Sequence, residues 1–177
     1  MHPGITYLHD SMVEAEIDRE LRDLLTTCFL KAEDDVFRRR RYYKEPYPNR
    51  WVIRGDQQEL VAHVGVHEKV IQAPAGLHRF GGIAEVCVHP DARGQGYVKA
   101  MLAVIHPWLA ERGFEFAVLF GDPEVYGSSG YTMVKNLVMD TDPTSPDSPR
   151  EPVTAMVRLL SESTWPDGEV YLPGLNF

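Results

Sequence analysis

The most informative part of the sequence is the stretch VCVHPDARGQGYV, which covers residues 86–98. Its first residues have a strand pattern, Pro90 turns the chain, and a turn containing Gly94 and Gly96 opens a helix pattern. At such a junction, several backbone N–H groups and the positive end of the helix point toward one place. The two glycines let a ligand approach the backbone closely, and Arg93 adds a positive charge. The stretch therefore predicts a binding site for a phosphate or pyrophosphate group.

Outside this stretch, strand and helix patterns mix without regular alternation. Apolar residues recur at helical spacing over Glu14–Phe29 and Gly96–Arg112, and we expect Pro107 to interrupt the second helix. The glycine-rich segment Ala73–Gly82 is expected to be a hairpin loop, and residues 141–152, rich in proline, an exposed connection. A short helix-like segment is expected at Asp122–Ser129. Strands are expected at Trp51–Arg54, Leu60–Val70, Gly82–Val88, Phe114–Phe120, Tyr131–Asp140, Thr154–Leu160 and Glu169–Leu172. This order predicts an α+β fold with a mixed sheet.

The composition is that of one acidic globular domain. The chain has 177 residues, with 18 Lys and Arg against 26 Asp and Glu, a net charge of −8, and we expect a single domain over residues 1–177. No apolar run approaches the roughly 18 residues that a membrane-spanning helix needs. Acidic residues stand near the N-terminus where a signal peptide needs an apolar core. We interpret Cys28 and Cys87 as reduced core thiols, which favours a cytoplasmic protein. Because the sequence has no long apolar run, we expect no membrane partner. The negative charge argues against nucleic acid as a partner and permits a cationic substrate.

Three kinds of phosphate-binding motif compete for the glycine turn. A Walker loop ends in Gly-Lys-Ser/Thr, which this sequence lacks. A dinucleotide fingerprint needs a third glycine where Lys99 stands, and a parallel sheet where the upstream strands are predicted to be antiparallel. The third motif fits, because Arg93-Gly94-Gln95-Gly96-Tyr97-Val98 resembles the acyl-CoA-binding motif Arg/Gln-x-x-Gly-x-Gly/Ala of the GNAT superfamily of N-acetyltransferases. Downstream, Tyr126-Gly127-Ser128-Ser129-Gly130-Tyr131 resembles the Tyr-x-x-x-Gly-aromatic element of that superfamily.

The resemblance implies the GNAT acyl-CoA N-acyltransferase fold, a mixed and strongly twisted sheet flanked by helices, with acetyl-CoA as co-substrate. Val98 departs from the motif, whose last position prefers Gly or Ala, and a β-branched residue there crowds the approach to the pyrophosphate. In the superfamily, one strand offers its backbone to the pantetheine arm and an N–H to the developing oxyanion. The cofactor-binding residues implied are Val86, Cys87 and Val88 for the pantetheine arm and Arg93, Gly94, Gln95, Gly96, Tyr97 and Val98 for the pyrophosphate.

The reaction implied is direct attack of a neutral amine on the acyl-CoA thioester. Tyr126 matches the superfamily's tyrosine that protonates the departing thiolate, and the alternative for it is a packed tyrosine with a hydrated hydroxyl. Glu85, on the strand before Val88, is the best-placed base for the ammonium, and the alternative is a salt-bridged or solvent-facing side chain. A chain of ordered waters and the carboxylate of Phe177 are the other candidate bases.

Weaker resemblances bear on the acceptor. Residues Tyr7–Phe29 resemble the start of aminoglycoside 2′-N-acetyltransferases, and Trp165–Val170 is similar to those enzymes and to the rhizobial nodulation-factor N-acyltransferase. Both kinds of enzyme acylate an amino group of a sugar. They favour a small-molecule primary amine as the partner, with an aminosugar or an aminoglycoside-like compound preferred. The alternative function is a non-catalytic acyl-CoA-binding or regulatory module with the same fold, and assembly as a homodimer is left open.

The remaining polar residues give weaker signals. His63 and His67 lie about 13 Å apart at strand rise, too far to share an ion, so no metal site is predicted. His89 is expected to have a role in a turn, with a proton relay as the alternative. The basic run Arg38–Lys44 is expected to be a solvated loop or helix end, with contact to the CoA 3′-phosphate, an anionic acceptor or nucleic acid as the alternatives.

Overall fold

The computed structural model describes residues 4–175 and 177. Within these residues the strands form a mixed sheet in the order β1-β2-β3-β4-β5-β7-β6-β8, which confirms the predicted α+β fold. The chain divides into two compact units. One consists of the chain up to His67 together with Ile83–Val104, and the other of Glu68–Gly82 together with the chain from Ile105 onward. The single domain over residues 1–177 stays a prediction.

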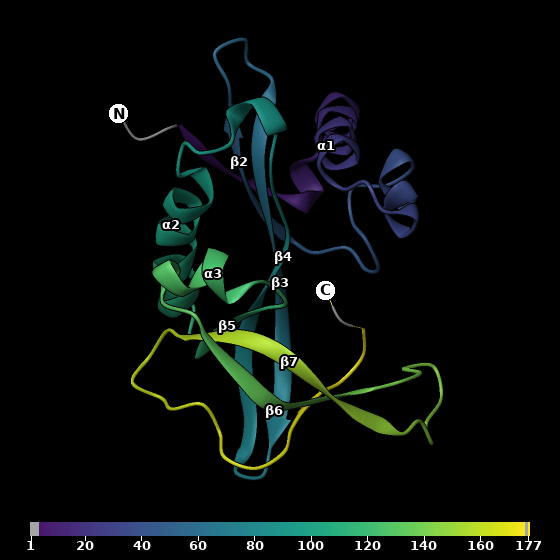
Figure 1. Ribbon diagram of the computed structural model, residues 1–177, viewed down its shortest axis with the longest axis vertical. Helices are drawn as coiled ribbons and strands as arrows, with labels where there is room; N and C mark the ends of the chain where they lie inside the picture. Colours follow the sequence, from purple (N-terminus) through teal and green to yellow (C-terminus); the bar gives the residue numbers. More distant parts are fainter. Residues whose placement is uncertain (1–3, 176) are drawn as a thin grey trace. The chain divides into compact units, whose positions relative to one another are not determined.

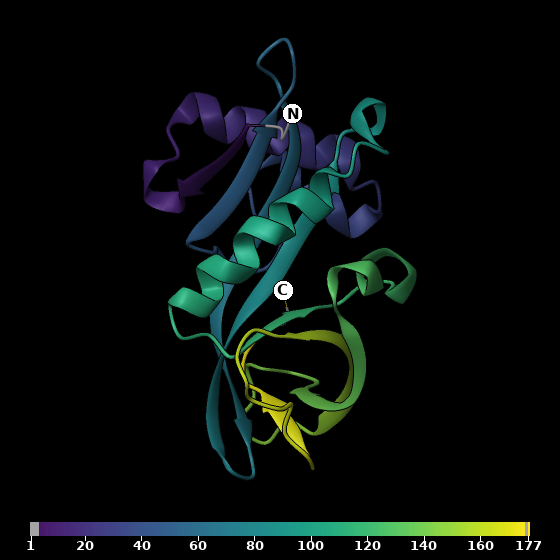
Figure 2. The same cartoon turned by 90° about the vertical axis from the view of Figure 1, so that its left-hand side faces the viewer.

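Three long elements contribute to both units: β3 (Leu60–Ala73), β4 (Gly76–Val88) and helix α2 (Tyr97–Glu111). In the first unit, β1 (Ile5–His9) pairs with β2 (Asn49–Arg54), and β2 pairs with β3, both in antiparallel fashion. Helix α1 (Ala15–Cys28) and the first half of α2 lie on opposite faces of these strands (Figures 1 and 2). Short 3-10 helices complete the unit at Asp10–Met12, Ala32–Arg38 (η2) and Pro90–Ala92 (η3).

Helix α1 is held by one apolar face. Leu21, Leu24 and Leu25, three and four residues apart, are buried there. Each fully buried leucine stabilises the folded chain by about 1.5–3 kcal/mol relative to an exposed one. The cluster they form also contains Phe37, Val52, Leu60 and Cys87. Because Cys87 stands two residues after Glu85, this core anchors the strand that carries the candidate base.

The second unit begins with the tip of the β3–β4 hairpin and continues through β5 (Phe116–Leu119), α3 (Pro123–Tyr126), η4 (Gly127–Ser129), β6 (Thr132–Asp140), β7 (Arg150–Leu159) and β8 (Val170–Leu172). β5 runs parallel to β4 and antiparallel to β7, while β6 runs antiparallel to β7 and parallel to β8. Figure 2 shows β6 and β7, in green and yellow, as a strongly twisted ribbon. The buried core of this unit includes Phe80, Phe116, Leu137, Val157 and Val170.

The segment predicted as a hairpin loop is mostly strand. β4 begins at Gly76, so only Pro74 and Ala75 turn the chain. Two glycines in the segment serve close packing instead of a turn. A Cβ on Gly81 would lie 2.5 Å from a methyl carbon of Leu109, and one on Gly82 would lie 2.9 Å from the ring of Phe177. β4 pairs with β5 only over Phe80–Gly82, the last residues of β4 in this unit.

Other boundaries also differ from the prediction. Strand β1 was missed, since three of its five side chains are exposed and its sequence shows no alternation. Helix α2 continues through Pro107, which was expected to interrupt it. β7 begins at Arg150, so the connection predicted over residues 141–152 is shorter, a loop over residues 141–149 between two paired strands. Among the described residues, no helix has the length and apolar character needed to cross a membrane.

Candidate active site

The stretch after β4 forms a tight turn that leads into α2. The N–H of His89 donates to the carbonyl of Val61 at 2.8 Å, which ties the turn to β3. The ring Nδ1 of His89 accepts a hydrogen bond from the N–H of Asp91 at 3.3 Å, at the start of η3. His89 thus has the turn role expected from the sequence.

The glycine turn has the geometry of an anion site. Gly94 and Gly96 have φ of +77° and +73°, in the left-handed region that favours glycine. No described atom lies within 4 Å of a Cβ built on either residue, so the space above the turn is open. The first bond of the helix runs from the N–H of Ala100 to the carbonyl of Gly96 at 3.0 Å. The N–H groups of the first turn, beginning at Tyr97, therefore have no partner within the helix and form its positive end.

A pocket of about 760 Å³ borders this turn within the first unit. Asp91, Ala92, Gln95 and Tyr97 line it from the motif. Arg54, at the end of β2, and residues 55–57 of the β2–β3 connection line it as well. Arg93 is exposed and its Nε donates to the carbonyl of Val88 at 3.3 Å, so its guanidinium lies beside the end of the strand. The motif thus combines free backbone donors, a cation and an adjoining hollow.

Glu85 interrupts the regular course of β4. Its φ of +41° is rare for a residue with a side chain and occurs in mid-strand, where no turn demands it. Its carboxylate Oε1 accepts a hydrogen bond from the N–H of Tyr43 at 3.0 Å. The other oxygen, Oε2, is buried and has no hydrogen-bond partner in the described part of the chain. Burial raises the pKa of Glu85, while the nearby hydroxyl of Tyr47, the N–H of Tyr43 and the charge of Arg50 act in the opposite direction. The salt-bridged and the solvent-facing alternatives for Glu85 do not match this environment.

A buried polar cluster surrounds Glu85. His63 is fully buried, with Nδ1 2.9 Å from the carbonyl oxygen of Glu85 and Nε2 3.4 Å from the hydroxyl of Tyr47. Burial, together with the charge of Arg50, lowers the pKa of His63 to about 3. The Tyr47 ring lies against Gly65, where a Cβ would be 2.5 Å from two ring carbons. Gly65 is therefore needed to admit the Tyr47 ring to the cluster.

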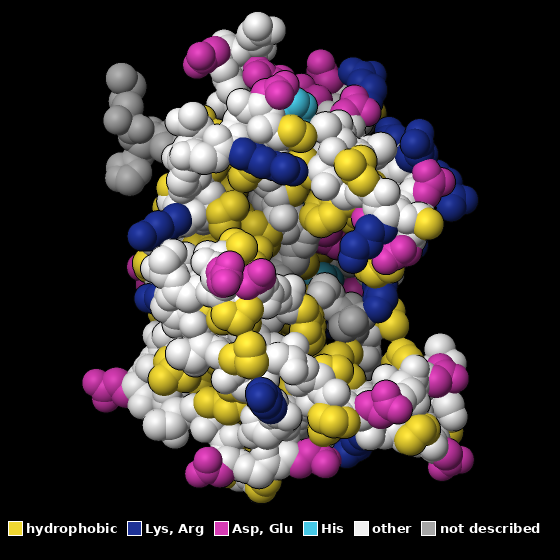
Figure 3. Space-filling view, viewed as in Figure 1, with side chains coloured by type: hydrophobic (Ala, Val, Ile, Leu, Met, Phe, Trp, Pro, Cys, Tyr) yellow, Lys and Arg dark blue, Asp and Glu magenta, His cyan; other side chains and the backbone are white. Residues whose placement is uncertain are grey.

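Part of the basic run is structural. The guanidinium of Arg41 binds Asp10 at 2.7 Å and Asp18 at 2.8 Å, and Arg50, fully buried, also binds Asp10. These partners raise the pKa of Arg41 and lower those of both aspartates against the effect of burial. Figure 3 shows Lys and Arg side chains interspersed with Asp and Glu over this part of the surface, around α1 and η2. The solvated basic loop expected from the sequence is wrong for Arg41, which joins the 3-10 helix at Asp10–Met12 to α1.

Tyr126 lies in the second unit, as the last residue of α3. Asp122 caps this short helix, since its side chain accepts from the N–H of Glu124 at 2.8 Å. The Tyr126 ring is half-buried and covers Gly121, where a Cβ would lie 2.5 Å from the ring. Its edge meets the ring of Tyr131 at a centroid distance of 6.1 Å. Gly130, in the left-handed conformation at φ +82°, closes the turn between the two tyrosines.

The other residues singled out in the sequence have structural surroundings. Phe177 packs its ring against Phe80 and Phe120, with centroid distances of 5.8 and 5.2 Å, in the core of the second unit. Cys28 and Cys87 are free thiols that hydrogen-bond to each other, which lowers the pKa of Cys28 and raises that of Cys87. No group of three or more His, Cys, Asp or Glu side chains suited to a metal ion occurs in the described ranges.

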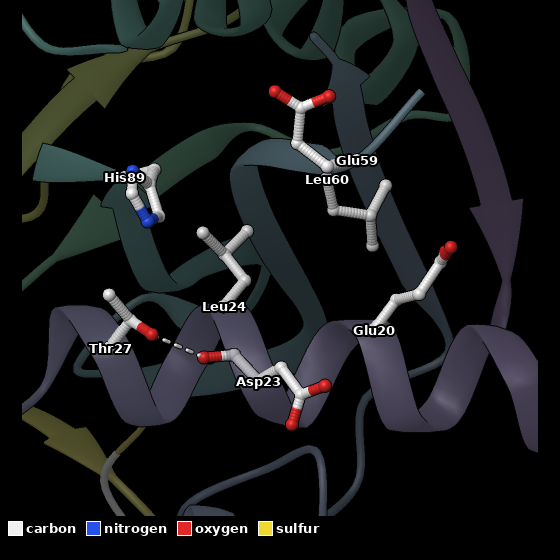
Figure 4. Close-up of a pocket in the computed structure, with 7 residues that line it drawn as sticks. All are labelled: Glu20, Asp23, Leu24, Thr27, Glu59, Leu60 and His89. Carbon is white, nitrogen blue, oxygen red and sulfur yellow. Dashed lines mark hydrogen bonds between the residues drawn. The ribbon is translucent and has the colours of Figure 1, made fainter. Parts of the chain in front are cut away.

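A second, smaller pocket of about 250 Å³ lies between α1 and the start of β3. Figure 4 shows Leu24 and Leu60 pointing into it, with the carboxylates of Glu20, Asp23 and Glu59 around it and His89 at one end. Glu20 already binds Arg54 at 2.7 Å, which neutralises part of this charge. The pocket is acidic, but none of the described residues that line it has a buried polar atom without a partner.

Glu85 was predicted from the sequence as a candidate base, and the residues around it were not. Tyr43 lies in the run Arg38–Lys44, which had been considered only for its basic charge, whereas Tyr47, before β2, and Arg50, in β2, lie outside that run. His63 was considered only as a metal ligand. A signal for these residues was available in the sequence. Polar residues that alternate with apolar ones in a predicted buried strand need hydrogen-bond partners inside the protein, which indicates a buried polar cluster.

Comparison with known proteins agrees with this geometry. A family described as acetyltransferase (GNAT) domain matches residues 11–134. GNAT family N-acetyltransferase YhbS of Escherichia coli, in complex with CoA, has a TM-score of 0.65 at 21% identity, over 97% of this chain and 92% of that one. A GNAT family acetyltransferase of Brucella melitensis, in complex with acetyl-CoA, has a TM-score of 0.59 at 14% identity, over 96% of each chain.

GCN5 of Tetrahymena has a TM-score of 0.61 at 12% identity, over 90% of this chain and 98% of that one. No curated protein matches the sequence at a significant level. At these identities the solved structures show the shared fold, and the family match covers well over half of the residues. The chain belongs to the GNAT acetyltransferase family.

Proposed function

We propose that this protein transfers an acetyl group from acetyl-CoA to the primary amine of a small cationic molecule. The observation that carries the proposal is the combination, in the first unit, of an open glycine turn at a helix N-terminus with a buried, half-satisfied carboxylate on the preceding strand. The E. coli and Brucella structures, which contain CoA and acetyl-CoA, support the choice of donor.

The turn Arg93–Val98 fits the pyrophosphate of CoA. Its first-turn N–H groups lack partners within the helix, its two glycines leave the space above the backbone open, and Arg93 adds a positive charge. In this proposal the backbone of Val86–Val88 holds the pantetheine arm, and one of its N–H groups stabilises the developing oxyanion. Val98, at the second position of α2, narrows the approach to the phosphates.

Glu85 is the proposed base. Its unpartnered Oε2 accepts a proton from the substrate ammonium, and the neutral amine nitrogen then attacks the thioester carbonyl carbon. Burial raises the pKa of Glu85, which strengthens it as a base at neutral pH. When the C–S bond of the intermediate breaks, Tyr126 donates its phenolic proton to the leaving sulfur, as its place in the Tyr-x-x-x-Gly-aromatic element implies, and the proton that the attacking nitrogen then loses restores the phenol.

A cationic acceptor is supported by the charge of the chain. The net charge of −8 attracts cations over a distance set by ionic strength. The acidic pocket of Figure 4 adds a local negative potential to the first unit. Together with the weaker sequence resemblances, this favours an aminosugar or an aminoglycoside-like compound over an anionic acceptor.

The test is CoA release from acetyl-CoA with a panel of aminosugars, aminoglycosides, polyamines and anionic amino acids. We expect release that depends on a cationic amine and falls by about 10²–10⁴-fold in Glu85→Gln, the range for loss of a general base. Glu151→Gln, an exposed carboxylate on β7, is the matched control and should retain full turnover. CoA binding without turnover on any amine would favour the non-catalytic module, and full turnover of Glu85→Gln would assign the base elsewhere.

A further inference from the structure

The backbone of Glu85 needs an explanation that the strand itself does not supply. Only Gln58 and Glu85, among the described residues other than glycine, have φ in the left-handed region. Gln58 lies in the β2–β3 turn, where its N–H donates to the carbonyl of Gly55 at 3.1 Å, and the turn accounts for its conformation. Glu85 lies in the middle of β4, and such a conformation costs about 1–3 kcal/mol unless its surroundings impose it.

His63 contacts the backbone at this kink. Its Nδ1 lies 2.9 Å from the carbonyl oxygen of Glu85, and a carbonyl oxygen only accepts, so Nδ1 carries the hydrogen. The low pKa of His63, about 3, keeps the ring neutral at physiological pH. Nε2 is then an acceptor, and it faces the hydroxyl of Tyr47 at 3.4 Å. The carbonyl of Glu85 alone fixes this tautomer, because the Tyr47 hydroxyl also donates to the carbonyl oxygen of Arg41 at 3.2 Å, and full burial keeps water from replacing the Nδ1–H contact.

The side chain of Glu85 is held separately. The N–H of Tyr43 binds Oε1 at 3.0 Å, whereas Oε2 is buried without a partner in the described part of the chain. Backbone and carboxylate are therefore fixed by different elements, β3 and the segment before β2. The result is one carboxylate oxygen with a defined direction.

We propose that His63 is a positioning residue: its Nδ1–H holds the Glu85 carbonyl in the left-handed kink and so fixes the direction in which Oε2 accepts the proton of the amine. This inference rests on the proposed function of Glu85 as the base. The charged and titratable groups facing the pair are Arg50 and Tyr47 from β2 and the segment before it, Tyr43, and Cys87 on β4 itself.

The test compares substitutions at His63 that differ in where they place a donor. Asn places its amide N–H near the position of Nδ1, so His63→Asn should keep kcat within about threefold and leave the pH profile unchanged. His63→Leu has a similar volume and no donor, and should lower kcat by about tenfold or more with little change in KM for acetyl-CoA. His63→Leu should also shift the acid limb of the profile of kcat against pH, because the surroundings of the Glu85 carboxylate are no longer fixed. His63→Gln, whose amide reaches toward Nε2 instead, should behave like His63→Leu while keeping a polar group in the cluster.

A double-mutant cycle with Glu85→Gln separates positioning from general damage. If His63 acts through Glu85, His63→Leu should cause little further loss of kcat in the Glu85→Gln background. The same tenfold loss in both backgrounds would overturn the proposal, as would equal losses in His63→Asn and His63→Leu. If His63→Leu does not fold, the comparison of His63→Asn with His63→Gln decides in the same way. A Glu85→Gln enzyme with full activity would instead refute the proposed function, so the two failures are distinguishable.

Discussion

Substituting Gly96 by aspartate tests the phosphate site with little damage to the fold. A Cβ on Gly96 meets no described atom within 4 Å, so no side chain has to move. The φ of +73° costs a residue other than glycine about 1–2 kcal/mol of folding free energy. A bound pyrophosphate next to the new carboxylate adds repulsion of about 4 kcal/mol for two unit charges 4 Å apart near a protein surface. Since 1.36 kcal/mol corresponds to a factor of ten, we expect the Kd for CoA to rise at least about 100-fold.

The measurement is calorimetric titration of CoA into the wild type, Gly96→Asp and Gly96→Ala. The alanine variant carries the same backbone cost without the charge, so its Kd should rise much less. Gly76→Asp is the matched control, because Gly76 also has positive φ, at +139°, and open space, but lies at the tip of the β3–β4 hairpin. Its CoA affinity should be that of the wild type. If Gly96→Asp binds CoA as tightly as Gly76→Asp does, the phosphate site has been misplaced.

Three further predictions concern Tyr126, Gly65 and His106. Tyr126→Phe should lower kcat with little change in CoA affinity, measured by steady-state kinetics and titration, and unchanged turnover would remove Tyr126 as the acid. Gly65→Ala should lower the free energy of unfolding by about 1–3 kcal/mol in urea, because its Cβ would lie 2.5 Å from the Tyr47 ring, whereas Gly127→Ala, with open space, should cost less. Burial lowers the pKa of His106 to about 4, so between pH 6.5 and 4 the unfolded chain binds a proton that the folded chain does not, and stability falls as pH falls. The free energy of unfolding changes by about 1.4 kcal/mol per pH unit for such a group. From pH 6.5 to pH 5 the wild type should therefore lose about 2 kcal/mol more stability than His106→Gln, which has no titrating group at this position. Equal losses would contradict the assignment.

The glycine turn and the Tyr126 element were predictable because their geometry is local. The positive φ of Gly94 and Gly96 and the cap of α3 by Asp122 depend on residues close in sequence. The same holds for the turn at His89, whose partner Asp91 is two residues away. Such features can be deduced from spacing and residue type alone.

Features that depend on distant contacts were mispredicted. Gly81 and Gly82 have the composition of a loop, but they lie in a strand because Leu109 and Phe177 pack where their side chains would be. Arg41 has the sequence context of a solvated basic run, and only the fold brings Asp10 and Asp18 to it. The residues around Glu85 could not be grouped from sequence for the same reason, since His63 and Tyr43 reach it from 22 and 42 positions away.

The proposed function requires that an amine attack the thioester of acetyl-CoA on this protein. The most direct measurement is mass spectrometry of a cationic amine incubated with the protein and acetyl-CoA labelled with carbon-13 in the acetyl group. We predict a labelled amide formed in equal amount with free CoA, and its loss in Glu85→Gln. Release of CoA with the label recovered only as acetate, or binding of CoA with no labelled amide for any amine, would contradict the claim.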